Sequence, residues 1–144
     1  MRLAPLGLVW LSLIVGTAAP AAAAGAVEIV VTRVRDGQGI VHVELCPERL
    51  FLKICPYVGE AKAQAGTTTV RIPNVPPGRY AAQAYHDRNH NGHADRNFLG
   101  LPTEDVGFSN NALTALARPK FSVAAFDHGS EPQRITFEMR AVLH

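Results

Sequence analysis

The sequence predicts an all-β protein, a single β-sandwich with one long ordered loop. Apolar and polar residues alternate in several short runs, which is the pattern of half-buried strands. Turn residues, such as Asp36-Gly37 and Pro77-Gly78, separate these runs. No long stretch has the 3.6-residue apolar period of a helix. Short strands at close spacing are typical of a sandwich or a barrel.

The first 24 residues are predicted to be a secretion signal. Arg2 gives a positive start, residues 6–15 are apolar, and an alanine-rich tract with A-x-A sites follows up to Ala24. The apolar run is shorter than the roughly 20 residues that cross a bilayer, which disfavours the alternative of a membrane anchor. We therefore expect a periplasmic or secreted protein with one domain over 25–144 and no transmembrane segment in it.

The first three strands are expected over residues 27–32, 40–45 and 50–55. In the first of them, Val27, Ile29 and Val31 occupy alternate positions, which places their side chains on one face. The second and third runs repeat this period of two. Each of these strands is therefore expected to bury one face.

The three later strands are expected over residues 67–72, 80–86 and 135–142. The first of these is rich in β-branched residues, which suit a pleated surface. Prolines and Gly78 form the turn before the next strand. In the last strand, Ile135, Phe137 and Met139 lie on one face. Residues 112–117 and 121–126 are short enough for a helical turn or two each.

Two cysteines, Cys46 and Cys55, are the only ones in the chain. An even number in an exported protein predicts a disulfide. A loop of this size gives about 2–3 kcal/mol in the chain-entropy model. The alternative is a pair of metal-binding thiolates, which the absence of a CxxC spacing and of further thiols disfavours.

The charge of the expected domain is close to zero. Removal of Arg2 from the 14 basic side chains leaves 13, against 12 acidic side chains. The basic residues are scattered singly along the chain. This balance gives no electrostatic case for nucleic acid or for an anionic membrane as a partner.

The residues from 87 to 95 have the pattern D-x-N-x-N-G-x-x-D. In calcium loops of this type, side chains at positions 1, 3, 5 and 9 and a carbonyl at position 7 surround the ion, and a glycine at position 6 permits the turn. The sequence therefore predicts a calcium site. Its ligands are Asp87, Asn89, Asn91, Asp95 and the main-chain carbonyl of His93.

The match to a calcium loop is incomplete. Position 12, where helical calcium loops have a bidentate glutamate, is Phe98. Glu104, Asp105 or a distant residue is expected to supply the missing ligand. We expect a weak site, in the range of about 10⁻⁴–10⁻³ M. The alternatives are a plain polar turn and a loop that keeps this geometry without an ion.

Three histidines give a competing interpretation of the same region. His86, His90 and His93 lie within eight residues, and imidazole binds zinc, copper or nickel. His90 and His93 occupy the variable positions of the oxygen-ligand loop, so their side chains are expected to point away from its centre. A transition-metal site is therefore the alternative to calcium.

No catalytic motif is evident in the sequence. The run from Gly107 to Asn111 lacks the second glycine of a G-x-S-x-G nucleophile turn. Glu104 and Asp105 are adjacent, which does not indicate an acid–base pair across a substrate. We expect a non-enzymatic protein, and a hydrolase whose site assembles from scattered residues is the remaining alternative.

The central motif resembles that of an exported bacterial family catalogued as domain of unknown function number 2141. The resemblance is carried by residues 77–80, 85–87, 107–111 and 124–126, with Asn89, Asn91, Gly92, Asp95, Asn97, Gly100, Pro102, Glu104, Pro119 and Phe121. It covers nearly the whole expected domain. The family has no assigned activity. The entry into the strand at Tyr80 also resembles transthyretin-like and collagen-adhesin B-type domains, which implies a prealbumin-like or immunoglobulin-like sandwich.

The leading functional hypothesis is a structural or binding role. A calcium ion would neutralise Asp87 and Asp95 and order the segment over 87–120, which has little strand pattern. That segment would then present a surface to a partner such as a cell-envelope protein or a carbohydrate.

Overall fold

The computed structural model describes residues 16, 24–114 and 118–143, so the predicted signal lies almost wholly outside it. Every regular element of the described residues begins at Gly25 or later. The strands are β1 (Gly25–Val34), β2 (Ile40–Cys46), β3 (Tyr57–Lys62), β4 (Gly66–Val75), β5 (Gly78–Asp87), β6 (Val106–Phe108), β7 (Ala125–His128) and β8 (Gln133–Arg140). The short helices are η1 (Glu48–Leu50), η2 (Ser109–Asn111) and α1 (Phe121–Ala124).

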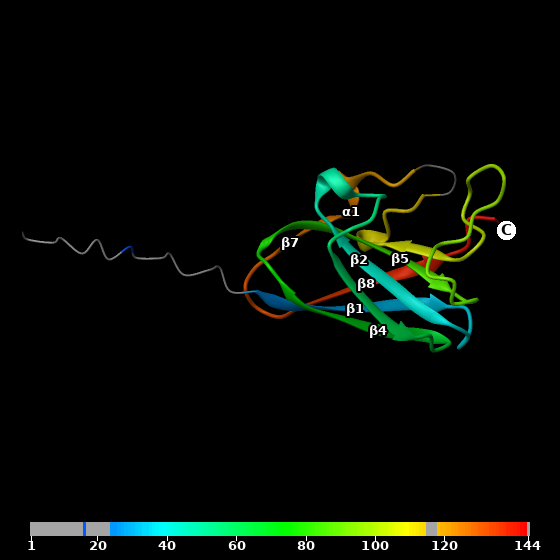
Figure 1. Ribbon diagram of the computed structural model, residues 1–144, viewed down its shortest axis with the longest axis horizontal. Coiled ribbons are helices and arrows are strands. Elements are labelled where there is room, and N and C mark those ends of the chain that lie inside the picture. The colour runs from blue at the N-terminus through cyan, green and yellow to red at the C-terminus, as the bar shows by residue number, and fades with distance from the viewer. Residues whose placement is uncertain (1–15, 17–23, 115–117, 144) are drawn as a thin grey trace, which may run out of the picture.

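The strands form one sheet that curves almost into a barrel (Figure 1). Their order is β3-β2-β5-β6-β8-β1-β4, and β7 pairs with β5 off this path. The first and last strands, β1 and β8, are parallel, whereas the other pairs are antiparallel. The predicted all-β class is confirmed.

Strand β5 lies within the half of the sheet that is formed by β3, β2, β5 and β6, and the segment 87–95 follows its end. One of its edges pairs with β2 from Ala81 to Asp87. The opposite edge pairs first with β7 and then with β6, and Ala82 lies between the two ladders. There the main-chain N–H of Ala82 donates to the hydroxyl of Ser109 at 2.8 Å, and this hydroxyl donates to the carbonyl of Ala124 at 2.5 Å. Ser109 therefore provides an acceptor for the N–H of Ala82 at the point where the strand paired with β5 changes from β7 to β6.

The core follows the period of two that the sequence predicts. Alternate residues of β1 are buried, from Val27 to Val31, and Phe137 and Met139 of β8 are buried in the same cluster. A second, smaller cluster covers the other face of β5, where Phe51 and Phe121 pack around Phe108 and its neighbours. The two clusters therefore cover both faces of β5 between Tyr80 and Tyr85.

The predicted strand over residues 50–55 is wrong. This segment contains the end of η1 and a turn, and the disulfide between Cys46 and Cys55 closes it into a small loop. Leu52 has a φ of 64°, which is incompatible with a strand, and Ile54 is 86% exposed. The two cysteines are paired as predicted.

Three strands were not predicted, namely β3, β6 and β7. The last two are short and lie within or after the long polar segment. Strand β3 follows the disulfide loop and packs closely on β4. A Cβ atom on Gly59 would lie 2.8 Å from a side-chain carbon of Ile72 and 2.9 Å from one of Val70. The absence of a side chain at Gly59 therefore lets the two ends of the sheet approach each other.

Substitution of Gly59 tests this close approach. We expect Gly59→Ala to lower the free energy of unfolding by about 1–3 kcal/mol, because an added methyl group overpacks the contact with β4. Urea unfolding followed by circular dichroism measures the change. Gly129→Ala is the matched control, because a Cβ atom there meets no atom within 4 Å. Equal stability of the two variants would contradict this account of the closure.

Candidate metal centre

The candidate loop begins at a buried carboxylate. Asp87 ends β5 and is fully buried. Its Oδ1 accepts the main-chain N–H of Asn91 at 3.0 Å, and its Oδ2 accepts that of Gly92 at 2.8 Å. Gly92 has a φ of 84°, which favours glycine and agrees with its predicted place in the turn. Asp87 thus folds the chain back directly after the strand.

Three further predicted ligands meet at the opposite side of the turn. The side-chain amides of Asn89 and Asn91 each donate to Asp95, at 2.7 Å in both cases. Together with the nearby His93, these hydrogen bonds hold the pKa of Asp95 below its ordinary value, with the Asn91 bond as the largest cause. The main-chain N–H of His93 donates to Oδ1 of Asn91 at 3.2 Å.

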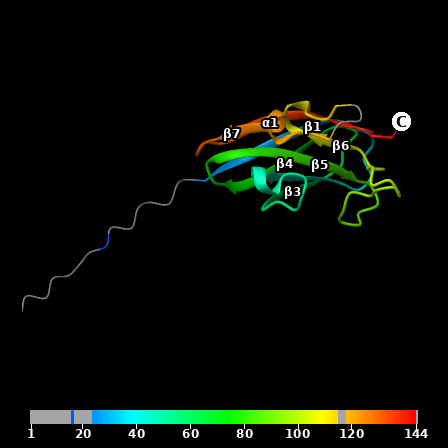
Figure 2. The same cartoon turned by 90° about the horizontal axis from the view of Figure 1, so that it is seen from above.

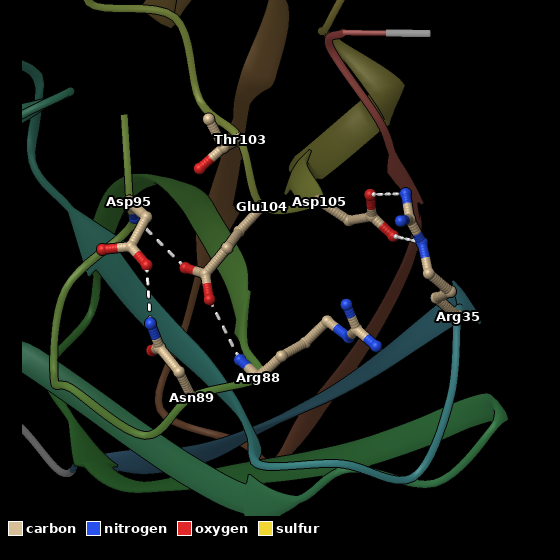
Figure 3. Close-up of a pocket in the computed structure, with 7 residues that line it drawn as sticks. All are labelled: Arg35, Arg88, Asn89, Asp95, Thr103, Glu104 and Asp105. Carbon is tan, nitrogen blue, oxygen red and sulfur yellow. Dashed lines mark hydrogen bonds and ion pairs between the residues drawn. The ribbon is translucent and has the colours of Figure 1, made fainter. Parts of the chain in front are cut away.

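Glu104 joins the two ends of the loop. Its Oε1 accepts the main-chain N–H of Arg88 at 3.0 Å, and its Oε2 accepts that of Asp95 at 3.1 Å. Asp105 instead receives two hydrogen bonds from Arg35, at 2.7 and 3.1 Å. Figure 3 shows Glu104 between Asp95 and Arg88, with Asp105 turned toward Arg35. Of the two adjacent carboxylates, only Glu104 therefore lies against the loop.

A polar pocket of about 210 Å³ lies beside these groups. Its lining, drawn in Figure 3, consists of Arg35, Arg88, Asn89, Asp95, Thr103, Glu104 and Asp105. The guanidinium of Arg88 is engaged by Asp36, 2.7 Å away. Among the described residues, the ion-pair partner of the Asp87, Asp95 and Glu104 carboxylates is a histidine alone, His93, at 3.3 Å from Asp95.

The chemistry of the donor set suits a hard cation. The side chains that hydrogen-bond within or onto the loop carry oxygen, from three carboxylates and two amides, and the imidazole of His93 lies beside Asp95. The two amides now direct nitrogen toward Asp95. A half-turn about the terminal bond exchanges nitrogen for oxygen without a change of shape, and in Asn91 it also gives up the hydrogen bond from the main-chain N–H of His93. Oxygen is the donor that calcium prefers, although each of the three carboxylates accepts two hydrogen bonds in this structure.

The three histidines of the competing interpretation do not form one donor set. His86 is fully buried, and its Nε2 lies 2.7 Å from the carbonyl of Gln38. His90 and His93 are exposed on the loop. Within the described ranges, the one group of three close metal-type donors is Glu44 with Cys46 and Cys55, whose sulfurs form the disulfide.

A second polar cluster, on the outer face of β2, was not predicted. His42 lies 2.8 Å from Glu60 and 3.1 Å from Glu44, and its ring stacks on Tyr85. Burial of the ring lowers the pKa of His42, but the hydrogen bonds and charges of the two glutamates outweigh this effect and raise it above 6.5. The cluster depends on the register of three strands, which the sequence alone does not reveal.

Comparison with known proteins gives one family. Residues 29–136 match the model of a family described as "Uncharacterized protein conserved in bacteria (DUF2141)". No curated protein and no solved structure matches the chain. The match spans both the loop and the sheet that supports it.

Removal of Glu104 should loosen the loop at both ends. We expect Glu104→Ala to lower the free energy of unfolding by about 1–3 kcal/mol, since two main-chain N–H groups lose their acceptor. Hydrogen exchange should become faster at the amides of Arg88 and Asp95. Glu131→Ala, at an exposed glutamate, is the control. Unchanged exchange at both amides would show that Glu104 does not hold the loop.

The pH dependence of His42 can be predicted in sign. Because its pKa is raised in the folded state, charged His42 stabilises the fold fully below pH about 6.5. This contribution is lost as the pH rises through the folded pKa. NMR titration of His42 should show a lower pKa in Glu60→Gln than in the parent protein. Glu28→Gln, on a strand of the other half, should leave it unchanged, and an equal effect of both variants would refute the assignment.

Proposed function

The chain belongs to the DUF2141 family of uncharacterised bacterial proteins, and we propose that it is an exported, non-enzymatic module whose loop 87–95 binds calcium. The ion would be held by Asp87, Asn89, Asn91, Asp95 and the main-chain carbonyl of His93, with Glu104 as a further ligand. Its role is structural: it orders the segment that leaves β5 so that this segment can present a binding surface.

One observation carries this proposal. Asp87 and Asp95 stand at the two ends of the loop 87–95, Glu104 accepts main-chain hydrogen bonds from its residues, and the ion-pair partner of these three carboxylates among the described residues is His93 alone. The loop and its contact residue thus carry three negative charges, which a divalent cation would neutralise in part. Calcium fits better than zinc because these side chains offer oxygen. Calcium also accepts six to eight oxygen ligands in a flexible geometry.

The scaffold supports an exported role. The disulfide between Cys46 and Cys55 is typical of proteins outside the reducing cytosol. No helix in the described part of the chain is long and apolar enough to cross a membrane. The strands also divide into a β3-β2-β5-β6 group and a β8-β1-β4 group, joined by the two-residue β6–β8 ladder. This division favours the two layers of a prealbumin-like sandwich.

The choice of variant matters for the test. Asp87→Ala would destabilise the protein even without an ion, because the buried carboxylate caps two main-chain amides. Asp95→Asn is more selective. It keeps the size of the side chain and removes one ligand charge at a partly exposed position.

We expect calcium to raise the melting temperature of the protein. An ion at 100 times its dissociation constant stabilises the folded state by about 2.7 kcal/mol. For a domain of this size that is a shift of several degrees. Melting is followed in chelator and then in millimolar calcium, magnesium or zinc. Asp95→Asn should reduce the calcium shift, whereas Asp127→Asn, at an exposed surface ion pair, should not.

Two results would overturn the proposal. Melting that is identical in calcium and in chelator would mean that the hydrogen bonds of the loop suffice without an ion. A shift with zinc alone, lost in His93→Ala, would establish histidine ligation in place of calcium.

A further inference from the structure

A small rigid hairpin, residues 96–102, projects from the candidate loop. Its base is an antiparallel bridge between Arg96 and Pro102, and Thr103 donates a main-chain hydrogen bond to Asp95 just below it, at 2.9 Å. In Figures 1 and 2 the yellow-green segment that contains the hairpin lies at the end of the domain opposite to the start of β1. The hairpin is therefore accessible when the N-terminal end is held elsewhere.

The tip of this hairpin is apolar and exposed. Phe98 is 95% exposed and Leu99 is 67% exposed, and Leu101 is 36% exposed beside them. A single exposed leucine is ordinary on a protein surface. Two adjacent large apolar side chains at the apex of an ordered turn are not, and they mark a site of interaction.

Several main-chain N–H groups of the tip are hydrogen-bonded within the hairpin. Oδ1 of Asn97 accepts the N–H groups of Leu99 and Leu101, at 3.0 Å each. The carbonyl of Asn97 accepts the N–H of Gly100 at 2.9 Å. Three successive donors thus have partners inside the hairpin. Transfer of the tip out of water consequently leaves these three donors paired, which lowers the cost of entering an apolar medium.

The charge of the hairpin is simple. Arg96 is its one ionisable residue, and its guanidinium donates to the carbonyl of Gly100 at 2.9 Å while it stays exposed. A cation is therefore fixed at the rim of an apolar tip. The tip itself thus carries one positive charge that can face lipid phosphate groups, whereas the carboxylates of Asp95 and Glu104 lie at the base of the hairpin.

We propose that the hairpin 96–102 inserts Phe98 and Leu99 into the boundary between headgroups and acyl chains of a phospholipid bilayer, with Arg96 on the lipid phosphates. A bilayer accepts a convex apolar tip without a shaped pocket. The insertion goes beyond the proposed function, because it does not require an ion in the loop.

The experiment uses the chain from Gly25, which contains every described strand. The one tryptophan of the sequence is Trp10, in the predicted signal, so this chain contains none. Leu99→Trp therefore places a single fluorescent reporter at the tip. Vesicles of equal parts phosphatidylglycerol and phosphatidylcholine are added in chelator and in calcium. Ile54→Trp, at the 86% exposed position of the disulfide loop, is the matched control.

The expected result is a blue shift of the tryptophan emission of Leu99→Trp on addition of vesicles, with no shift for Ile54→Trp. In the chain without an added tryptophan, Phe98→Ser should lower the vesicle partition coefficient about tenfold or more. The reason is that the variant lacks the aromatic ring that contacts the apolar part of the bilayer. Near-ultraviolet and far-ultraviolet circular dichroism verify that the variants fold.

The proposal is overturned if the emission of Leu99→Trp does not move with vesicles in either buffer. Equal partitioning of the parent chain and Phe98→Ser would overturn it as well, and would leave a protein pocket as the remaining occupant for the tip. Vesicle binding in chelator with no calcium effect on melting would refute the calcium loop alone. A calcium shift in melting without vesicle binding would refute the insertion alone.

Discussion

A carboxylate that is removed from water has to find hydrogen-bond donors, and Asp87 finds two of them in the main chain of the residues that follow it. This requirement ends strand β5 and reverses the chain within five residues. Glu104 closes the same turn from the other side by accepting the N–H groups of Arg88 and Asp95. The position of the hairpin 96–102 follows from these bonds, because the carbonyl of Asp95 also accepts the main-chain N–H of Thr103 at the base of the hairpin.

The sheet supplies the rigidity on which this turn depends. Strand β5 is paired along one edge with β2 and is divided between β7 and β6 along the other. Ser109 bridges the change of partner, and clusters of buried residues cover both faces. The loop therefore emerges from one of the best-supported strands of the protein.

Local patterns in the sequence predicted part of this architecture, and contacts between distant segments decided the rest. The alternation in β1 and β2 predicted both strands and their buried faces, because each strand buries one side. The same alternation misled at residues 50–55, where the disulfide and the positive φ of Leu52 override it. Strand β3 was missed because Gly59 breaks its apolar pattern, and with it the His42 cluster, which needs the register of β3 against β2. The loop motif could be found because its residues are close in sequence, whereas the contact of Glu104 with the loop depends on the fold of the hairpin between them.

The parallel ladder between β1 and β8 pairs Val27 with Gln133 and Thr32 with Glu138, residues more than 100 positions apart. Contacts between such distant segments are slow to form, because a long stretch of chain must be ordered first. The sheet also cannot gain strand β8 until a ribosome has made the residues beyond Gln133. The pairings of β1 with β4 and of β2 with β3 and β5 need no residue beyond Asp87, so the joining of β8 to β1 and β6 is the last step that becomes available as the chain is made.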